Sequence, residues 1–266
     1  MSLPQLWRSL RDQIWTLVWF GLGLAAYTLL IAAFWPTAKN NAALFSSYIA
    51  QFPEAFIKAF GIADITHFEG FIGAELLNFM WPLIVLVFVI MSASSFVAGE
   101  VDRGTVELWL SVPVSRWRLL AAKQVSLLLG IAILAAVTAG LIAVSGRLVD
   151  EPLSMTGLAG MGLVLASFSI AVGGYTSLFS SLFSSRGAAA GLAAGLTLAS
   201  YLAGVIAGIS KDVEWLKYVS LTSAYHPQQA LGGGGADPGE VAILLALGAV
   251  GAIGSLAAFQ TRDANP

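Results

Sequence analysis

Six long stretches of the sequence contain no Asp, Glu, Lys, Arg or His. They are residues 13–38, 76–99, 124–146, 152–185, 187–210 and 241–261. Each is longer than the roughly 20 residues that cross a hydrocarbon core about 30 Å thick. The 13 basic and 15 acidic residues all lie outside these stretches, as expected if a charge at mid-membrane costs roughly 3 kcal/mol. The sequence therefore predicts an all-α membrane protein with six transmembrane helices.

Composition excludes several other classes of protein. Charged residues make up 11% of the 266 residues and hydrophobic ones 58%, whereas soluble domains carry about 25% charged residues. Buried core helices are an alternative for apolar runs, but they are usually shorter and amphipathic. The chain has no Cys, which excludes disulfides and thiolate metal sites. Its net charge of -2 argues against nucleic acid as a partner.

The basic residues predict how the chain lies in the membrane. Arg8 and Arg11 precede the first stretch, which is too long for the 7–15 apolar residues of a signal peptide, so we expect a retained anchor. With both termini in the cytoplasm, eight basic residues lie inside and five lie in the longer outer loops. This bias favours a multi-pass protein of the cell membrane with both termini cytoplasmic.

We expect a single transmembrane domain over 1–266. Its spans are predicted at about 13–36, 75–98, 118–146, 154–183, 187–209 and 240–260. Leu3, Leu6, Leu10 and Ile14 follow a helical spacing before the first span, which predicts an N-terminal interfacial helix over 2–12 in the headgroup layer of the membrane lipid. An unstructured tail is the alternative.

The outer segments carry apolar and aromatic residues. Those between 39 and 75 form a broken apolar stripe, which predicts interfacial helices. Trp215, Tyr218 and Tyr225 suit an aromatic belt. Residues 232–235 are four glycines without the Gly-Lys-Ser/Thr ending of a phosphate loop, so we interpret them as a linker. No Walker A sequence occurs elsewhere, so any ATP must be bound by another chain.

The fifth span contains Gly187, Gly191 and Gly195 at four-residue spacing. Small residues on one face let two helices approach closely in lipid. The contact lies within one subunit or between two, and we favour a place near a subunit interface.

The loop between the second and third spans contains a helical charge pattern. Glu100, Arg103 and Glu107 fall on one face of a helix. Pro113 ends that helix, and Ser115 is suited to cap the third span. A solvated charged turn that only enforces topology is the alternative.

The same loop resembles that of ABC-2 type permeases, the membrane subunits of type V ABC exporters. The resemblance rests on Glu100, Gly104-Thr105, Glu107, the run Pro113-Val114-Ser115-Arg116, and Lys123 at the opening of the third span. The order of elements along essentially the whole chain is consistent with it. Trp109 stands where many relatives have an aliphatic residue.

The resemblance implies a dimer of six-helix subunits, either two copies or one copy with a paralogous permease. It also implies two cytoplasmic ABC ATPase subunits, which hold ATP and Mg, so this chain itself carries no cofactor, metal or catalytic residue. A coupling helix over about 100–112 would dock on the ATPase. The coupling residues would be Glu100, Arg103, Gly104, Thr105, Glu107 and Leu108. Candidates for the substrate pathway are Asn78, Met80, Trp81 and Pro82, with Pro82 mainly as a kink; packing alone explains these four equally well.

Three other functions compete with this one. An ion-coupled secondary transporter usually has ionisable residues inside its spans, and here only Glu75, at the mouth of the second span, could serve. An intramembrane enzyme would have only His67 and His226, which lack HExxH spacing. A membrane scaffold or immunity component that binds without transporting is the third. We expect an ATP-driven exporter subunit that is not itself an enzyme.

Overall fold

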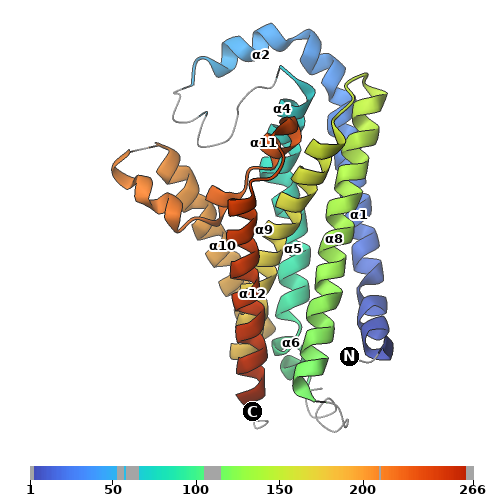
Figure 1. Cartoon of the computed structure of the whole chain (residues 1–266), viewed down its shortest axis with the longest axis vertical. Helices are drawn as coiled ribbons and strands as arrows, with labels where there is room; N and C mark the ends of the chain where they lie inside the picture. Colours follow the sequence, from blue (N-terminus) through green and yellow to red (C-terminus); the bar gives the residue numbers. More distant parts are fainter. Residues whose placement is uncertain (1–2, 53–56, 58–65, 105–114, 210, 262–266) are drawn as a thin grey trace.

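A computed structural model describes residues 3–52, 57, 66–104, 115–209 and 211–261 (Figure 1). Within them the chain forms helices and no strand. Six of the helices are long and apolar enough to cross a membrane. α1 begins and α12 ends at the same end of the bundle (Figure 1), as an even number of spans requires. The predicted class, an all-α membrane protein, is confirmed.

The described elements follow in chain order. They are α1 (Leu3–Asn40), α2 (Ala42–Ile49), α4 (Phe68–Ile72), η1 (Gly73–Met80), α5 (Trp81–Ser94), α6 (Ala98–Asp102), α8 (Arg116–Leu148), α9 (Met155–Leu182), α10 (Arg186–Ile209), η2 (Lys211–Tyr218), η3 (Leu221–Ala224), α11 (Pro227–Gln229), η4 (Ala230–Gly234) and α12 (Pro238–Thr261). The six candidate spans are Gln13–Asn40, Phe68–Ser94, Arg116–Leu148, Met155–Leu182, Arg186–Ile209 and Pro238–Thr261. Each overlaps one predicted span.

α1 differs from the prediction at the N-terminus. It is one helix from Leu3 to Asn40, whereas the sequence predicts a separate interfacial helix over 2–12. Residues 10–16 contain neither Pro nor Gly, so nothing interrupts the backbone hydrogen bonds there. The segment is helical, and it continues into the first span as one helix.

The second span is irregular. Residues Gly73–Met80 form a π-helix and Trp81–Ser94 an α-helix. Pro82 lies at the start of α5, and without an N–H it cannot bond to the carbonyl group of Asn78, four residues earlier. The change from π-helix to α-helix thus coincides with Pro82, which was predicted as a kink. The span also begins earlier than predicted, because Glu75 is exposed and does not end the helix.

α9 is the centre of the bundle. Of the 18 most apolar consecutive residues of α9, 56% are buried, whereas 11% of the corresponding residues of α10 are buried. α9 packs against α12 where Gly174 of one helix meets Gly248 and Gly251 of the other. A Cβ on Gly251 would lie 2.6 Å from the carbonyl oxygen of Gly174. This contact brings the two backbones together, as small residues do in membrane helices.

Short helices cover the end of the bundle opposite the termini (Figure 1). α11 and η4 lie against α4 and α9, and α11 also lies against η1, whereas η3 lies against α10 and α12. A Cβ on Gly160 of α9 would lie 2.8 Å from the backbone nitrogen of Ala236. Gly233 and Gly235 adopt φ values of 98° and 70°, which favour glycine. The glycine run thus forms a turn that lets residues 235–236 pack closely against α9.

Candidate functional site

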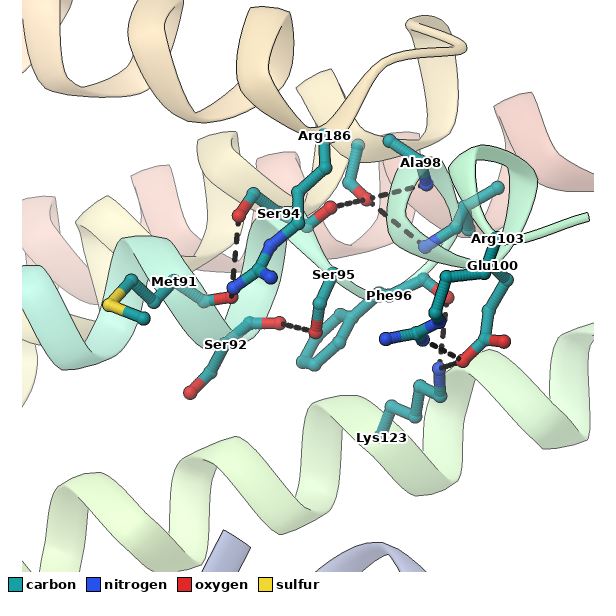
Figure 2. Close-up of polar contacts among 12 residues, drawn as sticks. Met91, Ser92, Ser94, Ser95, Phe96, Ala98, Glu100, Arg103, Lys123 and Arg186 are labelled. Carbon is teal, nitrogen blue, oxygen red and sulfur yellow. Dashed lines mark hydrogen bonds and ion pairs between the residues drawn. The ribbon is translucent and has the colours of Figure 1, made fainter. Parts of the chain in front are cut away.

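Hydrogen bonds and ion pairs from α8, α9 and α10 converge on the junction between α5 and α6. We call it the junction cluster and define it as residues 91–103 with Lys123, Ser180 and Arg186. Figure 2 shows that it joins the end of the second span to the start of the third and to the link between α9 and α10. It lies at the end of the bundle where α1 begins and α12 ends.

Ser180 stabilises the break between α5 and α6. Its Oγ accepts hydrogen bonds from the backbone N–H groups of Val97 and Ala98, both at 3.1 Å. The same hydroxyl donates to the carbonyl oxygen of Ser94 at 2.8 Å. Helix ends leave such backbone groups without partners, and here the side chain is fully buried. One serine of α9 therefore fixes the position at which the second span ends.

Glu100 is held by two cations. Its Oε1 lies 2.9 Å from Nη2 of Arg103 and 2.9 Å from Nζ of Lys123. Lys123 also donates to the carbonyl oxygen of Phe96 at 3.1 Å. The side chains of Glu100 and Lys123 are only 12% and 17% exposed, so their charges depend on one another for compensation. The cluster is therefore both a charge pair and a brace between α6 and α8.

Arg186 connects α10 to the same junction. The backbone N–H of Arg186 donates to Oδ2 of Asp102 at 2.7 Å. Its guanidinium Nη2 donates to the carbonyl oxygen of Met91, in the last turn of α5, at 3.0 Å. A carboxylate at a helix N-terminus and a cation at a helix C-terminus are both favourable with the helix dipoles. The two bonds tie the first residue of α10 to both sides of the junction.

The predicted coupling residues divide into three groups. Glu100 is buried in the chain, whereas Arg103 and Gly104 are exposed. Thr105, Glu107 and Leu108 lie outside the described residues. The continuous helix predicted over 100–112 is wrong at its start, because α6 ends at Asp102 and Gly104 has φ 66°. A positive φ is typical of the glycine that follows a helix end.

Ser115 takes the predicted place before α8 but not the predicted bond. It has extended backbone angles at the N-cap position, and its side chain makes no capping hydrogen bond.

The predicted pathway residues are neighbours in the sequence but do not line one common cavity. Trp81 is fully buried, and its Nε1 donates to Oγ1 of Thr138 at 2.9 Å, so it packs in the core. Met80 and Pro82 are half-buried. Asn78 donates to Oε1 of Gln228 at 3.3 Å and lines a cavity. Of the four, Asn78 is the one that lines this cavity.

That cavity has a volume of about 820 Å³ and lies between the second and fifth spans and the short helices. Asn78 borders it from η1, and Tyr201, Gly204 and Gly208 border it from α10. The loops that complete its wall were not predicted, because their approach to η1 depends on tertiary packing.

Three side chains that line the cavity, those of Glu214, Lys217 and His226, form close polar pairs. Nζ of Lys217 lies 2.6 Å from Oε1 of Glu214, and this hydrogen bond raises the pKa of Lys217. Nδ1 of His226 lies 2.9 Å from Oε1 of Glu240. Among the described residues no group of three or more His, Cys, Asp or Glu could hold a metal ion.

Tyr225 does not belong to an aromatic belt. It is buried, and its hydroxyl donates to the carbonyl oxygen of Leu77 at 2.7 Å; burial raises its pKa. The sequence prediction was wrong here, whereas Trp215 and Tyr218 are exposed as expected. The ring of Tyr225 instead packs 4.4 Å from that of Phe168, measured between centroids. It thus anchors the short helices to α9.

The glycine face of α10 meets no other part of the described chain. A Cβ on Gly191 or Gly195 would have no atom within 4 Å, and one on Gly187 would touch only Ser185. The buried residues of α10 are Ala189, Ala193 and Ser200, on another face. The predicted close contact is therefore not made with the described residues of this subunit.

Sequence reasoning missed three residues of the junction cluster. Asp102 and Ser180 were not singled out, and Arg186 was counted only for topology. A usable signal was present: Arg186 is the one charged residue between the fourth and fifth spans. Because the link is short, a charged side chain in it is expected to bond to polar groups at the ends of the neighbouring helices.

Comparison with known proteins gives a family for this arrangement. A search of curated proteins finds no match. The sequence model of the family described as ABC-2 family transporter protein matches residues 8–264, which includes all six candidate spans and the junction cluster. This multi-pass membrane protein therefore belongs to the ABC-2 family of transporter proteins.

Proposed function

We propose that the chain is the membrane-spanning permease subunit of an ATP-driven exporter, coupled to separate cytoplasmic ATPase subunits. The observation that carries this proposal is the family match over nearly the whole chain. Permeases of this family typically work with an ATP-binding subunit. The chain has no Walker A sequence, in agreement with such a division of labour.

The junction cluster is the part of the chain best suited to receive movement from the ATPase. It is a short helix braced by a buried ion pair, and a rigid connection transmits displacement rather than absorbing it. Arg103 and Gly104 are exposed next to it. We propose that these residues, with Thr105, Glu107 and Leu108 beyond them, contact the ATPase, and that both chain termini lie on the same cytoplasmic side.

The passage would form between two permeases. The glycine face of α10 is exposed in the single chain, and close helix packing in lipid uses such faces. The cavity beside Asn78 lies next to the same helix. A second copy or a paralogous permease on this face would place the two cavities around a shared path.

The proposal is tested by purifying the tagged chain from membranes of its native host and measuring ATP hydrolysis. We expect an ATPase subunit to accompany the chain. Glu107→Lys and Arg103→Ala should weaken that association and lower the ATPase activity of the purified complex. Lys39→Ala is the matched control, because Lys39 also forms an ion pair, at 2.6 Å with Glu151, but at the far end of the bundle.

Arg103→Ala leaves Glu100 paired with Lys123, so the fold should remain intact. Hydrolysis of ATP by the chain alone would contradict the proposal. Transport driven by an ion gradient in the absence of any ATPase subunit would contradict it as well and would support a secondary carrier.

A further inference from the structure

We propose that Asp102 and Arg186 form a mechanical joint through which α6 moves α10, while Ser180 holds the other end of α6 to the static part of the bundle. This inference rests on the proposed function, since it assigns the path by which movement of the coupling segment enters the membrane. It names the residues that position the moving helix.

α6 is attached at its two ends to different helices. At its start, Ser180 of α9 bonds the N–H groups of Val97 and Ala98. At its end, Asp102 accepts a hydrogen bond from the first residue of α10. α6 is five residues long and therefore one short rigid turn. α6 is thus bonded to α9 at its first residues and to α10 at its last residue, so a rotation of α6 about its contact with α9 would displace the start of α10.

The two attached helices differ in how firmly the subunit holds them. More than half of the 18 most apolar consecutive residues of α9 are buried, and its backbone meets that of α12 at Gly174. Only 11% of the corresponding 18 residues of α10 are buried. Because buried packing within a subunit resists displacement, a force on α6 moves α10 relative to α9 of the same subunit. The difference in packing therefore identifies α9 as the helix that stays in place and α10 as the helix that moves.

The contact between Asp102 and Arg186 fixes the position of α10 but adds little to the folding stability of the chain. Asp102 is exposed, and exposed charge interactions add little to folding stability. The bond from Arg186 N–H to the carboxylate is nevertheless short, at 2.7 Å, and a charge-assisted bond of this kind fixes geometry. The guanidinium bond to Met91 at 3.0 Å adds a second tether. Such a pair can be removed with the fold intact.

α10 carries the displacement to the rest of the protein. A helix of 24 residues is about 36 Å long at 1.5 Å per residue. Its first residue lies at the joint, its first half carries the glycine face, and Tyr201, Gly204 and Gly208 border the cavity in its second half. One rigid helix therefore connects the joint to both the proposed dimer contact and the proposed passage.

The absence of Cys allows a direct test with spin labels. Leu198→Cys on α10 and Ile133→Cys on α8 replace side chains that are 58% and 48% exposed, so both positions accept a label. The distance between them is measured in the purified complex with its ATPase, without nucleotide and after trapping with Mg, ATP and vanadate. Unlabelled subunits dilute the labelled ones if the two permeases are identical.

We expect trapping to shift this distance in the parent chain. In Asp102→Ala the shift should be lost although the complex still assembles and hydrolyses ATP. In Asp102→Asn the shift should persist, because the amide oxygen can still accept the bond from Arg186. A control pair, Val250→Cys on α12 with Ile133→Cys, should not shift in any of these backgrounds.

A parent-like shift in Asp102→Ala would overturn the joint, as would an Asp102→Asn chain as defective as Asp102→Ala. Trapped nucleotide without any movement of α10 in the parent chain would overturn the joint and leave the proposed function standing. If no ATPase subunit assembles and no ATP is hydrolysed, the proposed function fails before labelling, and the joint falls with it.

Discussion

Ser180 gives the clearest prediction for a single residue. Replacing it by Ala removes three hydrogen bonds and leaves the N–H groups of Val97 and Ala98 without their side-chain partner. An unsatisfied buried polar group costs about 1–3 kcal/mol. We expect Ser180→Ala to lower the free energy of unfolding by an amount in that range, measured by chemical denaturation in detergent.

Ser169→Ala is the control for this prediction. Ser169 is equally buried in α9, but its hydroxyl donates only to Leu165 within the same helix, at 3.0 Å. Such a bond adds little to helix stability, so its loss should be nearly neutral. Equal destabilisation by the two substitutions would mean that the bonds of Ser180 across the junction are not special.

For single residues, the sequence identified several candidate site residues but did not predict which of them contact one another. Glu100 and Lys123 were both singled out, yet their contact joins positions 23 residues apart and depends on how two spans pack. Trp81 was expected along the passage and Tyr225 in a belt, and both are buried. An aromatic residue with a polar atom suits either place, because it needs one partner and an apolar surround.

Among the elements, the crossing of α9 and α12 depends on glycine. Gly174 and Gly251 meet so closely that an added Cβ would collide with backbone, which cannot move aside. We expect Gly251→Ala to separate the helices and lower the midpoint of thermal unfolding in detergent by several degrees. Such a loss is typical when a larger side chain is forced into a packed contact.

Gly140→Ala on α8 is the matched control. A Cβ at Gly140 would have no atom within 4 Å, and Ala favours helix more than Gly does by about 1 kcal/mol. This substitution should therefore leave the midpoint unchanged or raise it. A Gly251→Ala chain as stable as the parent would show that the two helices adjust without cost.

The spans could be predicted because charge is excluded from the membrane core, and this rule acts on sequence alone. Their ends were less certain. Glu75 was taken as the start of the second span, but an exposed carboxylate is accommodated near the membrane surface, and the helix begins at Phe68. The turn after Asp102 was missed because Gly104 lay within an otherwise helical charge pattern.

At the scale of the whole molecule, the exposed surface is largely apolar. Trp15 and Trp19 on α1 and Val250 and Ile253 on α12 are each more than 60% exposed. In water such a surface would aggregate, whereas in lipid it is the normal exterior of a transmembrane bundle. α10 differs from α1 and α12 because its exposed face includes three glycines at four-residue spacing.

Association of two permeases can therefore be tested on α10 alone. Gly191→Leu adds a side chain where the single chain leaves space within 4 Å, so the subunit should fold normally. The same side chain would prevent close approach of a second helix. We expect the dissociation constant of the dimer in detergent to rise roughly tenfold or more, equivalent to about 1.4 kcal/mol. Native mass spectrometry at several protein concentrations would measure it.

Gly140→Leu separates this effect from a general effect of bulk on an exposed helix. Gly140 is also exposed, and a Cβ there would also have no atom within 4 Å. It belongs to α8, however, and to no series of three glycines at four-residue spacing, so its substitution should leave association unchanged. If Gly191→Leu dimerises like the parent, or if Gly140→Leu dissociates equally, the glycine face of α10 is not where two subunits meet, and the passage must be bounded by another helix.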